Sequence, residues 1–194
     1  MTVRRPRFLS LSPLLLLAAL AACGPTDYYL LPPEAAAGPA RASGVTLAVA
    51  DMDLPAYAGA LEIAALGAGG AVRLEENSLW ADTPGRALTR HMVAALQRRL
   101  GGQVAADPWP AYDPPALQLR VVVDRMIGGP DAPLDFSGQY ILVSSSGRNV
   151  AADRFQITVP PGGQGYAGLL ANHARAVELL ADQIAARIRR APGA

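Results

Sequence analysis

The 194-residue sequence contains no lysine and a single cysteine, and these two shortages exclude several classes of protein. All 17 basic side chains are arginines, and they are scattered along the chain rather than gathered in one stripe. Nucleic-acid binding, which needs clustered positive charge to displace counterions from phosphates, is therefore not expected. One cysteine cannot form an internal disulfide. With 17% charged and 51% hydrophobic residues, the composition is that of a folded domain.

Side chains that carry out chemistry are also few. The two histidines, His91 and His173, fall beside and within the apolar stripes of expected helices, so a structural role is favoured for each. No His-x₃-His or Cys-x₂-Cys pair exists, so a zinc site is not expected. Asp51 and Asp53 share one face of a strand end, where a solvated terminus is favoured over acid–base work.

Three further segments were weighed as catalytic or phosphate-binding motifs. The serines at 144–146 lack the strand–elbow–helix context of a nucleophilic serine. The glycine-rich segments 67–70 and 162–165 lack the Lys-Ser/Thr pair of a phosphate-binding loop, and turns are favoured for both. No catalytic constellation is assembled, and the protein is not expected to be an enzyme.

The N-terminus has the layout of a secretory signal over residues 1–22, with three early arginines followed by an apolar run. That run, 8–22, has 15 residues, fewer than the roughly 20 that a membrane-spanning helix needs. It ends at Ala21-Ala22-Cys23-Gly24, which resembles the bacterial lipoprotein box. We expect cleavage before Cys23 and acylation of its sulfur and new amine, palmitate included. An ordinary secretory peptide, or an uncleaved anchor, is the alternative.

Removal of the signal would leave 172 residues with 14 arginines and 16 carboxylates, a net charge of −2. Two or more acyl chains on Cys23 would hold the protein stably on a membrane. Gly24 stands where lipoproteins retained in the inner membrane of enteric bacteria usually carry Asp. The expected location is therefore the periplasmic face of the outer membrane. No cofactor is expected beyond the covalent lipid.

The remainder predicts one α+β domain over 45–194, joined to the lipidated cysteine by a tether within 23–44. Period-2 alternation predicts six short strands, at 45–49, 61–66, 72–80, 117–123, 134–145 and 150–159. Amphipathic helices are expected over 83–100, with Thr83 as N-cap, and over 166–190. We expect a mostly antiparallel sheet with both helices packed on one face. The apolar segment 28–31 is expected to add an edge strand, with burial against a partner as the alternative.

Three motifs carry a family resemblance. Tyr28-Tyr29-Leu30-Leu31 follows the cysteine, Leu54-Pro55-Ala56-Tyr57 follows the first strand, and a segment ending Leu79-Trp80-Ala81-Asp82 leads into the first helix. Together they resemble the ABC-type transport auxiliary lipoprotein family, of the PqiC and YmbA type, over essentially the whole mature chain. Residues 58–64 depart from the polar stretch usual in that family.

The resemblance implies a docking protein rather than a catalyst. Its expected partners are a mammalian-cell-entry (MCE) domain protein and the permease and ATPase of an ABC transporter. Such a system moves lipids or other hydrophobic molecules between the inner and outer membranes. Leu54, Pro55, Tyr57 and Trp80 are the expected partner contacts, with a core position equally open for Trp80. Homo-oligomerisation is compatible with this role. An unrelated periplasmic lipoprotein that binds or hydrolyses a ligand, or an outer-membrane assembly factor, are the alternatives.

Overall fold

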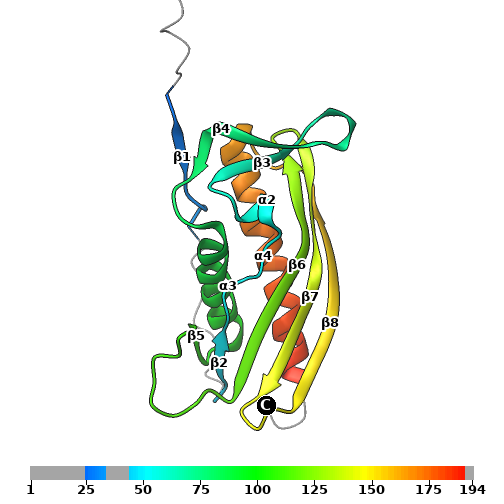
Figure 1. The fold of residues 1–194 in the computed structure, drawn as a ribbon. Helices are drawn as coiled ribbons and strands as arrows, with labels where there is room; N and C mark the ends of the chain where they lie inside the picture. Colours follow the sequence, from blue (N-terminus) through cyan, green and yellow to red (C-terminus); the bar gives the residue numbers. More distant parts are fainter. Residues whose placement is uncertain (1–24, 34–43, 191–194) are drawn as a thin grey trace, which may run out of the picture.

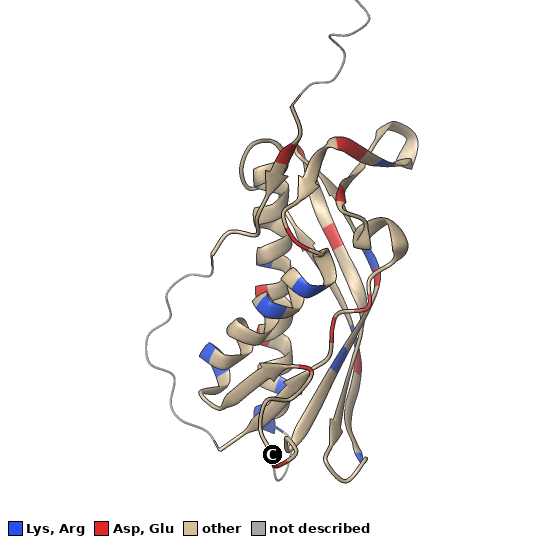
Figure 2. Ribbon diagram, turned by 60° about the vertical axis from the view of Figure 1, so that its left-hand side comes forward, with Lys and Arg blue, Asp and Glu red and all other residues tan. Residues whose placement is uncertain are grey.

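The computed structural model describes residues 25–33 and 44–190 (Figure 1). The expected signal sequence, Cys23 and residues 34–43 of the tether lie outside the described residues. Charged residues are spread along the described chain, with arginine positions and acidic positions interspersed (Figure 2). Within the described ranges, no helix combines the length and apolar character that crossing a bilayer requires.

Five strands make up the larger sheet. Their bounds are β2 (Thr46–Val49), β5 (Gln103–Ala106), β6 (Leu117–Gly129), β7 (Ala132–Ser144) and β8 (Asn149–Val159). The spatial order is β5-β2-β6-β7-β8. The long strands β6, β7 and β8 form an antiparallel meander, whereas β2 runs parallel to both of its neighbours.

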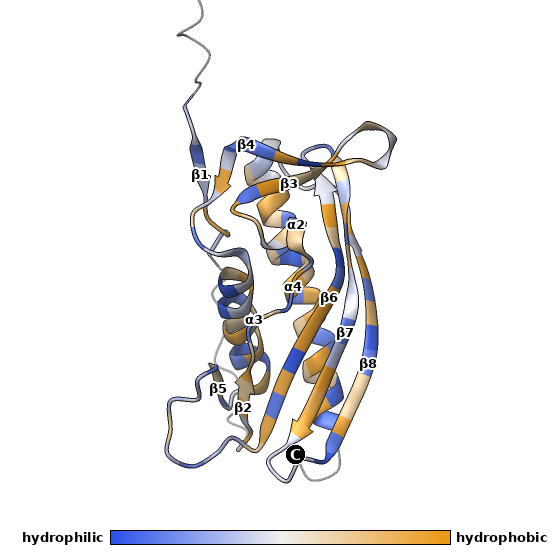
Figure 3. Ribbon diagram, viewed as in Figure 1, coloured by the Kyte–Doolittle hydropathy of each residue, from blue (hydrophilic) through white to orange (hydrophobic). Residues whose placement is uncertain are grey.

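Two helices, α3 (Pro84–Leu100) and α4 (Gly165–Arg190), cover one face of this sheet (Figure 1). Alternate residues of the strands point toward them, and the orange segments of Figure 3 mark this apolar layer. Phe136, Leu142, Val177 and Ile184 are among the fully buried residues. Burial of each such side chain stabilises the fold by about 1.5–3 kcal/mol, so the sheet–helix layer is the core of the domain.

A smaller sheet lies across one end of the molecule (Figure 1). It contains β1 (Asp27–Tyr29), β3 (Glu62–Leu66) and β4 (Val72–Trp80), in the order β1-β4-β3. β3 and β4 form an antiparallel hairpin whose turn contains the short 3₁₀ segment η2 (Ala68–Gly70). The one-turn helix α2 (Ala56–Gly59) precedes the hairpin.

The α+β class, both long helices and all six expected strands are confirmed, and the described residues form mixed sheets of eight strands with three α-helices. The expected edge strand is also present, because β1 pairs in parallel with β4 from Asp27 opposite Ser78 to Tyr29 opposite Trp80. The ring of Tyr29 contacts Tyr166 of α4 edge-on, with centroids 6.1 Å apart. Tyr29 and Leu31 are thus half-buried against the domain, whereas Tyr28 and Leu30 are exposed.

Three details differ from the expectation. β5 was not predicted, and β6 continues six residues past its expected end at Val123. The alternation breaks at Asp124-Arg125 because the pairing with β7 shifts register there. The hydroxyl of Thr83 makes no capping hydrogen bond to α3; the Thr83 N–H instead donates to Asp82 Oδ1 at 2.7 Å. The other end of α3 is as expected, since Gly101 adopts the left-handed conformation (φ 64°) and caps the helix.

Candidate functional site

A hollow of about 270 Å³ lies where the N-terminal segment runs past the first turns of α3. Residues 29–33 form one side, and Trp80, Asp82, Ala87, Arg90 and His91 form the other. Pockets for small-molecule ligands usually measure about 300–1,000 Å³. The hollow therefore matches one or two side chains of a partner better than a whole lipid molecule.

Trp80 forms the apolar floor of this hollow. Its side chain is only 5% exposed, and its ring meets that of His173 edge-on, with centroids 5.4 Å apart. His173 Nδ1 lies 2.8 Å from the Leu169 carbonyl oxygen. Complete burial lowers the pKa of His173 to about 4, so the ring is neutral at neutral pH. His173 therefore supports the tryptophan in the core, as the structural role expected for it requires.

The rim of the hollow carries one ion pair. Asp82 accepts from Arg90, and its other oxygen accepts from the Thr83 N–H. The hydrogen bond from Arg90 has the larger effect and that from Thr83 the next; together they hold the pKa of Asp82 below its usual value. The pair is exposed to solvent, so it marks the edge of the hollow without adding much to stability.

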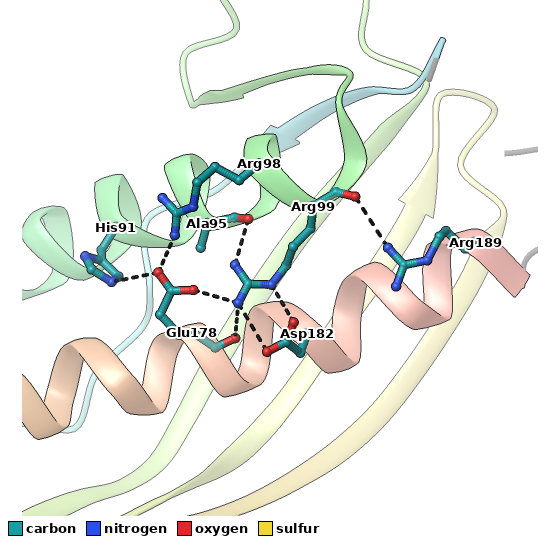
Figure 4. A network of polar contacts seen from close by, with 7 residues as sticks. All are labelled: His91, Ala95, Arg98, Arg99, Glu178, Asp182 and Arg189. Atoms are coloured by element: carbon teal, nitrogen blue, oxygen red, sulfur yellow. Dashed lines mark hydrogen bonds and ion pairs between the residues drawn. The ribbon is translucent and has the colours of Figure 1, made fainter. Parts of the chain in front are cut away.

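Behind the hollow, Glu178 of α4 collects three side chains of α3 (Figure 4). It pairs with Arg98, its second oxygen lies 2.6 Å from Arg99 Nη2, and His91 Nε2 lies 3.4 Å from the first oxygen. Partial burial alone would raise the pKa of Glu178, but the hydrogen bonds and charges of Arg99 and Arg98 outweigh it and lower that pKa. His91 lines the hollow and contacts Glu178, so it joins the two features.

Arg99 completes the connection between the helices (Figure 4). Its Nε and Nη2 donate to the two carboxylate oxygens of Asp182 at 2.7 and 3.1 Å, and further donors reach the carbonyls of Ala95 and Glu178. Burial alone would lower the pKa of Arg99, but the hydrogen bonds to Asp182 and Glu178 raise it. Arg98 and Arg99 of α3 are paired with Glu178 and Asp182 of α4, so the cluster fixes α3 on α4.

The structure does not bring the four expected partner contacts together in the hollow. Only Trp80 lines it. Leu54 is half-buried against the core, and Pro55 precedes the first turn of α2. Tyr57 is half-buried, and its hydroxyl accepts a hydrogen bond from the Met126 N–H at 3.2 Å. Cys23, the expected lipidation site, lies outside the described residues.

The weaker candidates have local roles. The backbone of Asp53 bridges to β6 at Val122, and Asp51 is exposed. Ser144 Oγ lies 2.9 Å from Ser146 Oγ within the β7–β8 turn. Over residues 25–33 and 44–190, no group of three or more His, Cys, Asp or Glu side chains is positioned to hold a metal ion.

The Glu178 cluster was missed by sequence reasoning, although one signal for it exists. Glu178 and Asp182 are four residues apart and are the only carboxylates of α4, and Arg98-Arg99 ends the other long helix. Residues four apart share a helix face. The spacing thus indicates an acidic patch on α4, but only the packing of the two helices shows which cations meet it.

The comparisons with known proteins bear on both fold and family. The family model described as "ABC-type transport auxiliary lipoprotein component" matches residues 28–185, which confirms the resemblance drawn from the motifs. The crystal structure of an uncharacterized protein matches with a TM-score of 0.70 and 22% identity, over 85% of this chain and 99% of that one. A protein from Xanthomonas campestris matches with a TM-score of 0.63 and 18% identity, over 82% and 93%. No protein of curated function matches the sequence.

Proposed function

The chain belongs to the family of ABC-type transport auxiliary lipoprotein components, and from this premise we propose that it is an outer-membrane lipoprotein that docks an ABC transport system. In this proposal Cys23 carries the lipid anchor on the periplasmic face. An MCE-domain protein and the permease and ATPase of the transporter are the partners. The system moves lipids or other hydrophobic molecules between the two membranes, and this protein contributes binding rather than catalysis.

The observation that supports anchoring most directly is the way the N-terminal segment is built into the domain. β1 begins at Asp27, four residues after Cys23, and pairs with β4. Four residues span at most about 14 Å, so a lipid on Cys23 would keep this end of the domain at the membrane surface. Tethering raises the local concentration of the domain beside its partners, so modest contacts suffice for assembly.

The hollow beside β1 supports docking over transport of cargo by this chain. Its volume of about 270 Å³ suits a side chain inserted over Trp80. Leu30, at its edge, is 73% exposed and is available to a partner. Leu54, Pro55 and Tyr57 are proposed as a second contact around α2, where Ala56 between them is exposed.

Mass spectrometry of the N-terminal peptide tests the anchor. Protein extracted from the membranes of its native host is expected to begin at Cys23 and to carry acyl chains there. A Cys23→Ser variant is the control, since it removes the acylated sulfur and should appear in the soluble fraction. An unmodified Cys23 in the native host would overturn the lipoprotein part of the proposal.

Binding to an MCE-domain protein encoded beside this gene tests docking. Leu30→Ala and Tyr57→Ala are each expected to weaken binding about tenfold, the usual loss for an interface residue that matters. Tyr112→Ala is the matched control, because Tyr112 is fully exposed and lies in the β5–β6 loop, away from the hollow. Equal affinities for all three variants would refute these contacts. Metabolic enzymes as the neighbouring genes would favour a ligand-binding or hydrolytic lipoprotein instead.

A further inference from the structure

The β3–β4 hairpin presents exposed apolar side chains near its tip. Leu66 pairs with Val72, and Ala64 pairs with Leu74, so these four side chains share one face of the hairpin, on which Ala64 is buried and the other three are exposed. Leu66, Val72 and Leu74 are 36%, 43% and 46% exposed. Single exposed apolar residues are common on protein surfaces, but an adjoining set indicates a contact surface.

The opposite face of the hairpin is the one that attaches it to the domain. Ile63, paired with Glu75, is 1% exposed, and the carboxylate of Glu75 lies beside the hydroxyl of Tyr166 at the start of α4. The three exposed side chains, Leu66, Val72 and Leu74, therefore lie on the face of the hairpin opposite Ile63 and Glu75. The turn between the strands, Gly67 to Ala71, contains only glycine and alanine, so no charged side chain separates the two arms at the tip.

The position of the hairpin relative to the start of the described chain indicates what covers this face. The hairpin lies across the end of the molecule at which β1 begins, and the last turn of α4 lies at the other end (Figures 1 and 2). Asp27 is paired with Ser78 of β4 itself. A lipid on Cys23 would lie within about 14 Å of Asp27, so it would bring this same end of the domain against the bilayer.

We propose that the β3–β4 hairpin is a second membrane contact, with Leu66, Val72 and Leu74 inserted among the lipids next to the anchor. This inference rests on the proposed acylation of Cys23. Apolar side chains of a protein lying on a membrane reach about 5–10 Å into the headgroup and acyl boundary. The insertion would hold the domain in one orientation, with the hollow beside β1 at a fixed height above the surface.

The charged residues of the hairpin indicate which lipid headgroups it would contact favourably. Arg73 is its one cation, and Glu62, Glu75 and Glu76 lie at its base. A net negative hairpin gains nothing from anionic headgroups, so the contact depends on apolar burial in a zwitterionic bilayer. Salt, which screens exposed charges within about 10 Å at 0.1 M, should therefore leave the insertion unchanged.

Depth measurement on the intact lipoprotein tests this proposal. The acylated protein, purified from membranes and returned to phosphatidylcholine vesicles, carries no free thiol, because its one cysteine is acylated. Leu74→Cys and, separately, Val72→Cys then each accept one environment-sensitive fluorophore. Tyr112→Cys is the matched control, since it replaces an exposed apolar residue far from the hairpin. The expected result is a blue-shifted emission quenched by nitroxide-labelled lipid at 72 and 74, with neither effect at 112.

Each other outcome has a distinct meaning. Emission at 72 and 74 that matches that at 112 would overturn the membrane contact, with the anchor still in place. A blue shift that appears only when the MCE-domain partner is added would assign the face to that protein instead. A shift that depends on protein concentration and resists lipid quenching would assign it to a second copy. Two fluorophores per chain would reveal a free Cys23 and so refute the proposed anchor itself.

Discussion

Acidification from pH 7 to pH 5 is expected to destabilise the domain through His173. This side chain is completely buried in α4 against Trp80, and burial lowers its pKa to about 4. In the unfolded chain it binds a proton near its ordinary pKa of 6.5. Between these two values the unfolded state carries the extra proton, so the free energy of unfolding falls as the pH falls.

The magnitude follows from the width of that window. Each pH unit between 6.5 and about 4 removes about 1.4 kcal/mol of stability, so roughly 2 kcal/mol is lost by pH 5 and about 3 kcal/mol over the whole window. Above pH 6.5 the histidine contributes no pH dependence. Glu178 and Asp182 have lowered pKa values, so their contribution is lost only below their ordinary values of 4.5 and 3.8. The interval from pH 6.5 to 5 therefore leaves out these carboxylates, and a variant that lacks His173 separates its effect from that of His91, the other histidine of the sequence.

Urea unfolding at pH 7, 6 and 5 measures the effect, with His173→Leu as the control. Leucine fills a similar volume, and Leu169 O remains within the backbone ladder of the helix, so the variant should lie within about 1.5 kcal/mol of the wild type at pH 7. Between pH 6.5 and 5 its stability should then fall by roughly 2 kcal/mol less than that of the wild type. A wild-type curve that falls no more steeply than the variant curve would refute the assignment of the acid sensitivity to His173.

Five further substitutions, two of them controls, test the packing. Gly138→Ala should lower the free energy of unfolding by about 3 kcal/mol or more, because a Cβ there would overlap the Val122 carbonyl oxygen and lie 3.0 Å from Val123 Cα. Gly59→Ala is the control: its Cβ would meet no atom closer than 4.0 Å, so the melting temperature should change little in the same thermal melt. Glu178→Gln leaves Arg98 and Arg99 without their shared carboxylate and should cost about 1–3 kcal/mol in urea unfolding. Asp182→Asn, at an exposed pair, should cost under about 1 kcal/mol, and equal costs would contradict the central role of Glu178. Tyr57→Phe removes the acceptor for the Met126 N–H and should cost about 1 kcal/mol, and no change would show that water replaces it.

The two long helices and the β6–β7–β8 meander were predictable because each carries a strong local pattern. Leu169, Val177, Leu180 and Ile184 repeat at helical spacing, and all of them are buried. Consecutive strands joined by short turns leave few alternatives to antiparallel pairing. Local periodicity was thus sufficient wherever neighbours in sequence are also neighbours in space.

β5 and the pairing partner of β1 depend on contacts that no local pattern contains. β5 is four residues long and lies beside β2, whose residues are more than 50 positions earlier. β1 has three residues and meets β4 about 50 positions later. Such short strands form because a strand distant in sequence offers a free edge for pairing. The local sequence of β1 or β5 does not show that this edge exists.

The candidate site was the least predictable part. Trp80 and Tyr57 have similar apolar character in the sequence, yet the first forms the floor of a hollow and the second is held by a backbone N–H of β6. The segment 72–80 was predicted as a strand, but nothing in it indicated which of its side chains are exposed. In the structure Val72 and Leu74 are exposed, whereas Glu75 is half-buried beside Tyr166 of α4.

The three-residue pairing of β1 with β4 also sets the length of the chain that connects the lipid anchor to the domain. With β1 in place, Asp27 is the fourth residue after Cys23, so the chain between a lipid on Cys23 and β1 reaches at most about 14 Å. If β1 were released, the first strand after the anchor would be β2 at Thr46, and 23 residues of extended chain reach at most about 80 Å. A partner that displaced β1 from the edge of β4 would therefore increase the greatest distance between the lipid anchor and the domain more than fivefold, without breaking a covalent bond.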